Sequence, residues 1–201
     1  MTFTQRKSPE ARFWEWFEQN EVSLFSFETD QGVIFSKLAS ELHRIDSHLT
    51  FEFGPNENGK RDFVISAGGI KSAFASVVKL ADAAPQLARW NIIKFRPRRE
   101  PLNTVQIGNI SVDPDDVLFT MQPDGDKVDI TLYLADQKSF DKKLHAQISF
   151  LLLDQAIGEY DVETFVGHIE FRPKEMNSRL SKRQLTKLAS EFDKLLKTIS
   201  H

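Results

Sequence analysis

Three side chains in the second half of the chain, His145, Asp154 and Glu159, are of types used in general acid–base catalysis. His145 and Asp154 fall nine residues apart in a predicted helix, which separates them by about 13 Å along its axis. They therefore cannot form a direct hydrogen bond. Glu159 and Tyr160 follow at a predicted corner between the helix and a strand, where polar groups can converge. We predict Glu159 and Tyr160 as binding residues and no catalytic residues.

Basic side chains form two similar corners. The first lies in the stretch 96–101, which has three arginines and two prolines, and the second lies at Arg172 and Lys174. Arginine presents a rigid fork of donors, so these corners could bind phosphate or carboxylate groups. The alternative is a solvated linker that keeps its charge in water. The predicted binding residues outside the Glu159 corner are Trp90, Arg96, Arg98, Arg99, Arg172 and Lys174.

Known catalytic and ligand-binding motifs do not occur in the sequence. The chain has no cysteine, no G-x-S-x-G and no H-E-x-x-H. Gly68-Gly69 lacks the spacing of a phosphate loop. Asp113 and Asp116 could bind a divalent cation, but the neighbouring turn does not complete a calcium loop, and turn chemistry explains these residues. We therefore predict no metal and no cofactor.

Composition limits the class of protein. The chain has 201 residues, of which 40% are hydrophobic, and its net charge is −3. That length suits one large domain or two small ones that share a core. The near-balance of charge argues against a surface built wholly for nucleic acid. The lack of cysteine fits a reducing cytoplasm, and no apolar run is long enough for a signal peptide or a membrane span. We expect a cytoplasmic protein without a membrane segment.

The stretch 145–171 positions the Glu159 corner. Its first part has helical spacing, with apolar residues on nearly all sides. Gly158 stands where a helix needs a left-handed terminating residue. The hydrophobic period then changes from 3.6 to 2, which predicts a strand from Val162 to Phe171, and Pro173 ends it.

An internal repeat organises the whole chain. Ile92–Pro97 matches His168–Pro173, and each match follows a helix that itself follows a hairpin. The first hairpin joins 49–53 to 62–67, and the second joins 117–121 to 128–134. We predict an N-terminal part at 1–97, a linker at 98–103 and a second part at 104–201, which could pack as one globular domain.

The predicted fold class is α+β, with two strand–strand–helix–strand units of ferredoxin-like character. Its sheet is mainly antiparallel with helices on one face. Two further helices precede the first unit, the first starting at Ser8-Pro9 and the second near Asp30. One more helix follows the second unit, where apolar residues recur at three and four positions. That spacing favours docking on the chain's own sheet over dimer formation, and both a monomer and a homodimer stay open.

The sequence from Leu151 to Tyr160, together with Gly167–Phe171, resembles uncharacterised bacterial proteins, and so does Phe63–Ala67 followed by Ala83-Ala84-Pro85 and Arg89-Trp90. This resemblance covers most of the chain and implies no known activity. A more distant similarity, in the pattern of helices and strands, is to bacterial ribonuclease E inhibitor-like proteins. That similarity implies a regulatory module that binds a protein partner.

Three functional hypotheses follow. The first is a cytoplasmic interaction or regulatory module without chemistry of its own. The sequence has many residues typical of a hydrophobic core but no set of residues typical of a catalytic site. The second is a small-molecule or metal-dependent enzyme with a site at the interface of the two units. The third, less favoured, is RNA binding through the basic corners, which predicts an affinity that falls steeply with salt.

Overall fold

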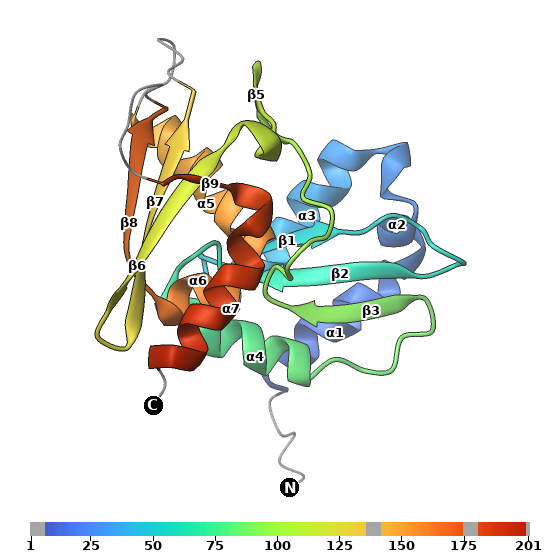
Figure 1. Ribbon diagram of the computed structural model, residues 1–201. Helices are drawn as coiled ribbons and strands as arrows, with labels where there is room; N and C mark the ends of the chain where they lie inside the picture. Colours follow the sequence, from blue (N-terminus) through green and yellow to red (C-terminus); the bar gives the residue numbers. More distant parts are fainter. Residues whose placement is uncertain (1–6, 136–141, 175–180, 200–201) are drawn as a thin grey trace, which may run out of the picture. The chain divides into compact units, whose positions relative to one another are not determined.

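The computed structural model of the protein describes residues 7–135, 142–174 and 181–199. The chain divides into two compact units, residues 1–95 and 96–201, here called unit 1 and unit 2 (Figure 1). Both combine helices with sheet, and most strand pairs of the described chain are antiparallel, so the predicted α+β class is confirmed. In the described ranges, no helix has both the length and the apolar character needed to cross a membrane.

Unit 1 is a three-stranded sheet with helices before it and in its crossover. Strand order is β1-β2-β3, with β1 antiparallel and β3 parallel to β2. Ser8 begins the first helix by accepting a hydrogen bond from the Ala11 N–H at 3.1 Å. Three α-helices precede the sheet where the sequence predicts two. The elements are α1 Pro9–Gln19, α2 Glu21–Phe25, η1 Phe27–Thr29, α3 Gln31–His43, β1 Thr50–Phe53, β2 Arg61–Ser66, η2 Lys71–Ala73, α4 Phe74–Asp82 and β3 Trp90–Lys94.

Aromatic side chains fill the core of unit 1. Phe63, on β2, stacks on Phe17 of α1 with ring centroids 5.2 Å apart, and Phe53 of β1 meets it edge-on at 5.3 Å. The Trp14 indole N–H donates to the Leu80 carbonyl at 2.8 Å, which joins α1 to α4. Such aromatic pairs add stabilisation beyond the area they bury.

Unit 2 contains a small hairpin and a four-stranded sheet in the order β8-β7-β6-β9. β6 is antiparallel to both β7 and β9, whereas β7 and β8 are parallel. The predicted second hairpin is present, and its two-residue turn contains Gly125 at φ 60°. The elements are β4 Val105–Ile107, β5 Ile110–Val112, η3 Pro114–Asp116, β6 Leu118–Asp124, β7 Lys127–Leu134, α5 Lys142–Ile157, α6 Glu159–Phe165, β8 Val166–Pro173, β9 Arg183–Gln184, η4 Leu185–Lys187 and α7 Leu188–Ile199.

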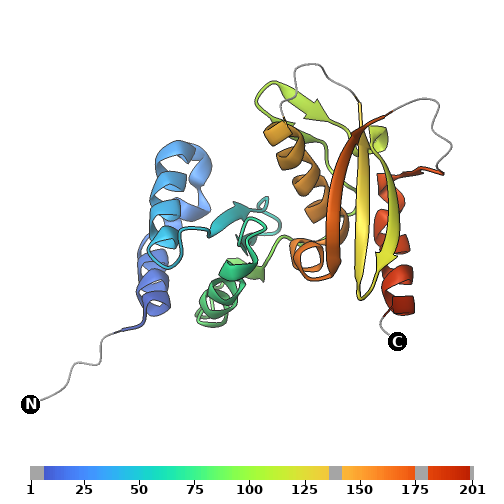
Figure 2. The ribbon, with the colours of Figure 1, turned by 90° about the vertical axis from the view of Figure 1, so that its left-hand side faces the viewer.

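Helices α5, α6 and α7 cover one face of the unit 2 sheet. Leu152 of α5, Phe192 of α7 and Leu132 of β7 are all fully buried in one apolar core that is mainly aliphatic. The C-terminal helix thus docks on its own sheet. Figure 2 shows the sheet from its other side, with no helix in front of β6, β7 and β8. We call this side the helix-free face.

The two units share the strand–strand–helix–strand arrangement that the repeat predicts. In each, an antiparallel pair is followed by a crossover to a parallel third strand. In the repeat, Lys60–Ile65 lines up with Lys127–Leu132, so Phe63 corresponds to Ile130. The register differs, because Phe63 pairs with Ile92 in unit 1 whereas Ile130 pairs with Ile169 in unit 2. A register shift between Val128 and Ile130 accounts for this one-residue offset.

The predicted strand from Val162 to Phe171 is wrong in its first four residues. Residues Glu159–Phe165 form the helix α6, and β8 begins only at Val166. Gly158 does have a positive φ, 87°, but its ψ of 142° turns the chain into a new helix. The Val162 N–H then donates to the Gly158 carbonyl at 3.0 Å, and the Lys127 ammonium group donates to the Thr164 carbonyl at the far end. Although polar and apolar residues alternate here as in a strand, the short helix still buries the apolar side chain of Val162 in the core.

Candidate functional site

Arg96 and Glu159, both predicted as site residues, meet in unit 2 at the turn between α5 and α6. The Arg96 N–H donates to the Glu159 carboxylate at 3.0 Å, and the Glu159 N–H donates to the Arg96 carbonyl at 3.0 Å. The Arg96 side chain reaches Asp154 of α5, with 3.3 Å between Nη1 and Oδ2. We call Arg96, Asp154 and Glu159 the Arg96 cluster.

The carboxylates of the Arg96 cluster are enclosed. Glu159 is 0% exposed and Asp154 is 5% exposed. The pKa of Asp154 is raised to about 7, chiefly because burial disfavours its charged form. The Arg96 guanidinium lowers this pKa, while the negative charges of Glu159 and Glu163 raise it. Asp154 can therefore gain or lose a proton near neutral pH inside the protein.

Arg98 fastens the same segment to two helices. Its Nε donates to the carbonyl of Ile157 at 2.8 Å, at the end of α5. Its two terminal nitrogens donate to Asp161 of α6 at 2.6 Å and to Asp193 of α7 at 2.9 Å. The fork that could have bound a phosphate or carboxylate ligand thus binds carboxylates of unit 2 itself.

The segment 98–103, predicted as a linker, is bound along α5. The Arg99 N–H donates to the Gln155 carbonyl and the Asn103 N–H to the Gln155 side chain, both at 2.8 Å. A solvated linker would leave these amides to water, whereas here they are satisfied by one glutamine. The Arg99 side chain itself is exposed.

Two of the predicted site residues lie apart from this cluster. Trp90 is in the core of unit 1 and is 4% exposed, with Phe17, Phe25 and Phe53 around its indole at 4.8–5.6 Å between ring centroids. Its ring therefore contributes to packing. Tyr160 is the residue after Glu159 on α6, and it is 49% exposed. The Glu159 corner thus points one side chain inward and the next outward.

The second basic corner lies on β8, at the end away from α6. Arg172 forms an ion pair with Glu170, with 2.9 Å between Nε and Oε1. The Lys174 N–H donates to the Leu134 carbonyl at 2.7 Å, and its ammonium group donates to the Asp116 carbonyl at 2.9 Å. Arg172 lies six residues along the strand, about 20 Å, from the start of β8 next to α6. The structure does not bring the two basic corners together into one patch.

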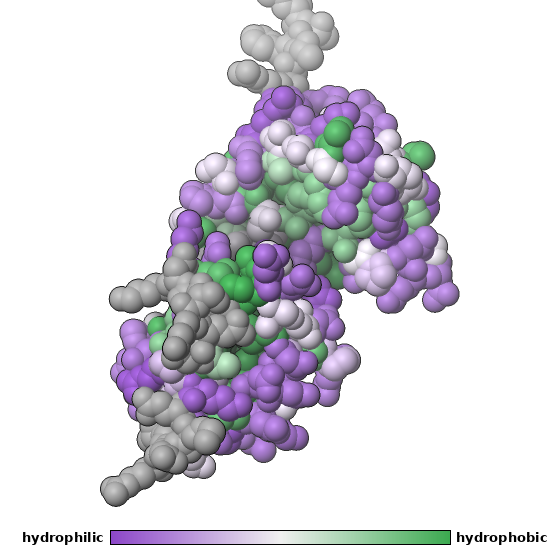
Figure 3. Space-filling model, turned by 90° about the horizontal axis from the view of Figure 1, so that it is seen from above, coloured by the Kyte–Doolittle hydropathy of each residue, from purple (hydrophilic) through white to green (hydrophobic). Residues whose placement is uncertain are grey.

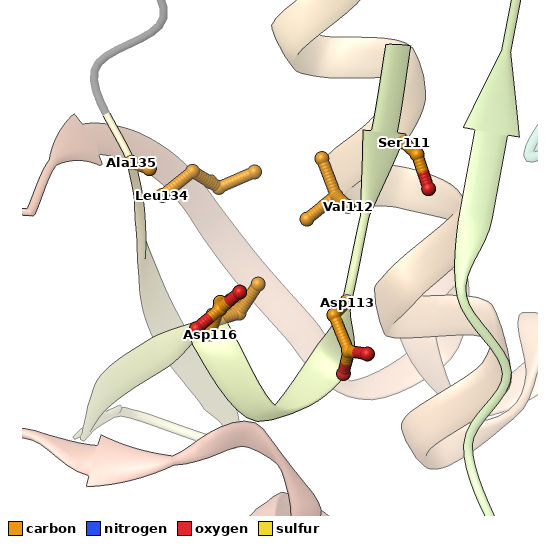
Figure 4. Close-up of a pocket in the computed structure, with 7 residues that line it drawn as sticks. Ser111, Val112, Asp113, Asp116, Leu134 and Ala135 are labelled. Carbon is orange, nitrogen blue, oxygen red and sulfur yellow. The ribbon is translucent and has the colours of Figure 1, made fainter.

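Small hollows lie on the part of unit 2 that the structure describes. Figure 4 shows one of about 50 Å³, where Val112 and Leu134 point toward each other above Asp113 and Asp116. The Asp113 carboxylate accepts the Asp115 N–H at 2.9 Å, so it caps the turn as the sequence suggests. In the described ranges, no three His, Asp or Glu side chains gather to hold a metal ion.

Two further hollows among the described residues measure about 160 Å³, beside His145 and Phe171, and about 280 Å³, between Leu102 and Ala189. Small-molecule pockets usually occupy about 300–1,000 Å³. Each of these hollows is therefore smaller than a typical ligand pocket.

The partners of the two arginines were not identified from the sequence. Asp161 and Asp193 carry no local signal, because each is an ordinary helix-surface carboxylate. Asp154 does carry one, since it interrupts a run of three leucines in a helix that is covered on most sides. A carboxylate is seldom buried without a charged or hydrogen-bonding partner, so its position indicates one.

The fold and the Arg96 cluster together define an α+β protein of two strand–strand–helix–strand units whose central polar groups are enclosed. No protein-family model matches the chain, and neither a curated protein nor a solved structure matches it.

Proposed function

We propose that the protein is a non-catalytic interaction module, and that unit 2 binds a protein partner through its helix-free face. The observation that carries this proposal is the layer structure of unit 2. Three helices cover one side of its sheet, whereas β6, β7 and β8 present their other side without a helix (Figure 2). A regulatory role and a cytoplasmic location belong to the same proposal and derive from the sequence.

Polar side chains make up the helix-free face. Because Ile130 and Leu132 of β7 enter the core, Asp129, Thr131 and Tyr133 alternate to the other side. Only Tyr133 among these three is buried, and the Lys182 ammonium group lies 4.1 Å from its ring centroid. A broad polar surface on a rigid sheet suits a protein partner with complementary polar groups.

The charged side chains that could take part in catalysis or ligand binding support the same proposal. Arg96, Asp154 and Glu159 bind one another, and Arg98 binds two carboxylates of unit 2. These contacts fasten the segment 96–103 to its helices. A structural use for each group favours a module that recognises through its surface over one that transforms a substrate.

The two alternatives stay predictions. RNA binding would use the basic corners, but Arg96 and Arg98 have carboxylate partners inside unit 2 and the corners lie apart. An affinity for RNA that falls steeply between 50 and 200 mM salt, roughly in proportion to the phosphates contacted, would support it. A metal or small molecule that co-purifies at one equivalent would support an enzyme.

The test is site-specific photo-cross-linking in cells that naturally make the protein. A photoreactive amino acid replaces Thr131 at the centre of the helix-free face, and a matched control replaces Lys194 on the exposed side of α7. We expect one dominant cross-linked protein from the Thr131 position that is absent from the Lys194 position. The same products from both positions, or none from Thr131, would refute the proposal.

A further inference from the structure

The strand β8 is an edge of the unit 2 sheet. The N–H groups of His168 and Lys174 donate to acceptors of β7 at 2.8 and 2.7 Å. Because backbone groups alternate in direction along a strand, those of Ile169 and Phe171 face away from β7. Among the residues that the structure describes, no strand pairs with this outer edge. A long edge of this kind is a template for another strand.

An apolar side chain lies beside this edge. Phe150 of α5 is 38% exposed, although large apolar side chains of a covering helix normally point into the core. It meets Phe171 of β8 edge-on, with ring centroids 5.9 Å apart. Figure 3 shows that hydrophobic residues, in green, reach the surface of the molecule in places among hydrophilic ones. Two adjacent phenylalanines at a sheet edge form a surface that a partner could cover.

The charges on β8 are complementary to themselves when the strand is reversed. Glu170 and Arg172 both alternate to the helix-free face, because Ile169 and Phe171 pack against the core. In an antiparallel pair of two β8 strands with Phe171 opposite Phe171 of the partner subunit, each Glu170 stands opposite an Arg172. We infer that unit 2 forms a symmetric homodimer through this pairing of β8 with β8.

The neighbouring registers are disfavoured by charge. Moving the partner by two residues in one direction places Glu170 opposite itself, and moving it by two in the other places Arg172 opposite itself. Like charges directly opposite each other destabilise a sheet. A further shift toward the start of β8 brings in the irregular stretch beside Val128. The Phe171-centred register is therefore the one that the sequence of β8 selects.

This pairing satisfies the outward backbone groups. The two Phe171 residues exchange N–H to carbonyl hydrogen bonds, and each Ile169 N–H donates to the partner's Pro173 carbonyl. Two four-stranded sheets become one continuous sheet, and the two Phe150 side chains meet over the junction. The dimer goes beyond the proposed function, because it needs no other protein and leaves the helix-free face open.

Sedimentation equilibrium on the full chain tests the dimer. The chain has a mass of 23.1 kDa, so the dimer has twice that mass. The variant Glu170→Arg makes the edge all basic and Arg172→Glu makes it all acidic, and we expect each to weaken dimerisation at least tenfold. Equimolar mixing of the two variants restores opposite charges in a heterodimer. Unchanged dimers in both variants, or no heterodimer on mixing, would overturn the inference.

A disulfide locates the twofold axis independently of charge. The natural chain has no cysteine, so Phe171→Cys introduces a single thiol. Directly opposite residues in a hydrogen-bonded antiparallel pair have Cα atoms about 5.5 Å apart, within the range of disulfides. We expect oxidation to link Phe171→Cys into dimers and to leave the control Thr131→Cys monomeric on denaturing gels, with circular dichroism confirming that both fold. A wild-type chain that stays monomeric at about 1 mM would rule the dimer out.

Discussion

The two units solve the same folding problem with different side chains. Unit 1 packs its sheet with rings, among them Phe17, Phe63 and Trp90, whereas unit 2 packs the equivalent sheet with aliphatic residues such as Ile130 and Leu132. Both keep an antiparallel pair and a parallel third strand. The arrangement of strands therefore depends on where apolar residues recur and much less on which apolar residues they are.

The units differ most at the end of the third strand. In unit 1, β3 stops at Lys94, and Phe95 takes a φ of 61°, rare for a residue with a side chain. In unit 2 the matching residue, Phe171, stays within β8, which continues to Pro173. Both β3 and β8 are edges of their sheets, but β3 has 5 residues and β8 has 8, so the edge of unit 2 is longer. A repeat can thus keep its topology while its copies differ in the length of an edge strand.

Truncating the matched residues Phe63 and Ile130 should have the largest effect and tests the difference between the cores. Both are at most 1% exposed. Phe63→Ala should lower the free energy of unfolding by about 3–5 kcal/mol and Ile130→Ala by about 2–5 kcal/mol, with the larger loss for Phe63 because it contacts several rings. Urea denaturation measures both. Val22→Ala, at a side chain that is 72% exposed, should change stability by less than about 0.5 kcal/mol. A smaller loss of unfolding free energy for Phe63→Ala than for Ile130→Ala would contradict the contrast between an aromatic and an aliphatic core.

Asp154 should make the stability of the protein pH-dependent. Its pKa is raised from 3.8 to about 7 in the folded protein, so the folded state holds a proton that the unfolded state releases. The contribution of Asp154 to stability should therefore be full below its unfolded pKa and fall as pH rises toward about 7, by on the order of 1 kcal/mol per pH unit. Asp154→Asn should remove this slope, whereas Asp126→Asn at an exposed turn should keep it. Equal slopes in all three proteins, measured by urea denaturation, would show that Asp154 does not titrate in this range.

The sequence predicts those parts of the fold that local pattern determines. Alternation and turn residues locate both hairpins, and the repeat predicts the shared topology. The helix α6 is missed because Val162, Thr164 and Val166 also alternate like a strand. What makes this stretch helical is remote: Glu159 binds Arg96, which is 63 residues away in sequence. A pattern confined to a short window cannot contain that contact.

The candidate site shows the same limit. Arg96, Arg98 and Glu159 stand out in the sequence as charged residues at corners, but nothing local indicates that they belong to one cluster. Arg172 matches Arg96 in the repeat, yet it pairs with Glu170 on its own strand. The difference in partners follows from Phe95, where the chain turns away from the sheet of unit 1. Residue type is therefore predictable from one sequence, whereas the partners depend on the path of the chain.

The turn at Gly158 should give the next largest effect, and it is specific to unit 2. Its φ of 87° and ψ of 142° lie in a region that residues with side chains seldom enter. An added Cβ would meet only ordinary contacts, the nearest at 3.5 Å from Arg98, so backbone strain dominates. Gly158→Ala should lower the free energy of unfolding by about 1–3 kcal/mol. The control Gly32→Ala adds a Cβ with nothing within 4 Å and should not destabilise. Thermal and urea unfolding measure both variants. If Gly158→Ala and Gly32→Ala change the free energy of unfolding by the same amount, then the backbone at Gly158 is not strained by a side chain.

The smallest expected effect on the free energy of unfolding comes from a comparison of two arginines, Arg98 of unit 2 and Arg61 of unit 1. Arg98 of unit 2 keeps 34% of its side chain exposed, whereas Arg61 of unit 1 keeps 7% and lies between Glu28 and the rings of Phe25 and Phe27. Arg98→Ala should lower the free energy of unfolding by about 1 kcal/mol, the sum of two weak, partly exposed ion pairs and one hydrogen bond.

Salt should distinguish the two arginines further. Raising the salt from 0.1 to 1 M shortens the screening length from about 10 to about 3 Å, so the loss caused by Arg98→Ala should shrink. The loss caused by Arg61→Ala should shrink by a smaller fraction. The buried Arg61 guanidinium also donates to the Gly54 carbonyl and packs on the rings of Phe25 and Phe27, and salt screens these contacts less than the pair with Glu28, whose side chain is 56% exposed. The control Lys194→Ala on α7 should have little effect at either salt concentration. If urea denaturation shows the same fractional salt dependence for both arginine variants, then exposed ion pairs carry the same share of both losses, and the contrast between the two arginines fails.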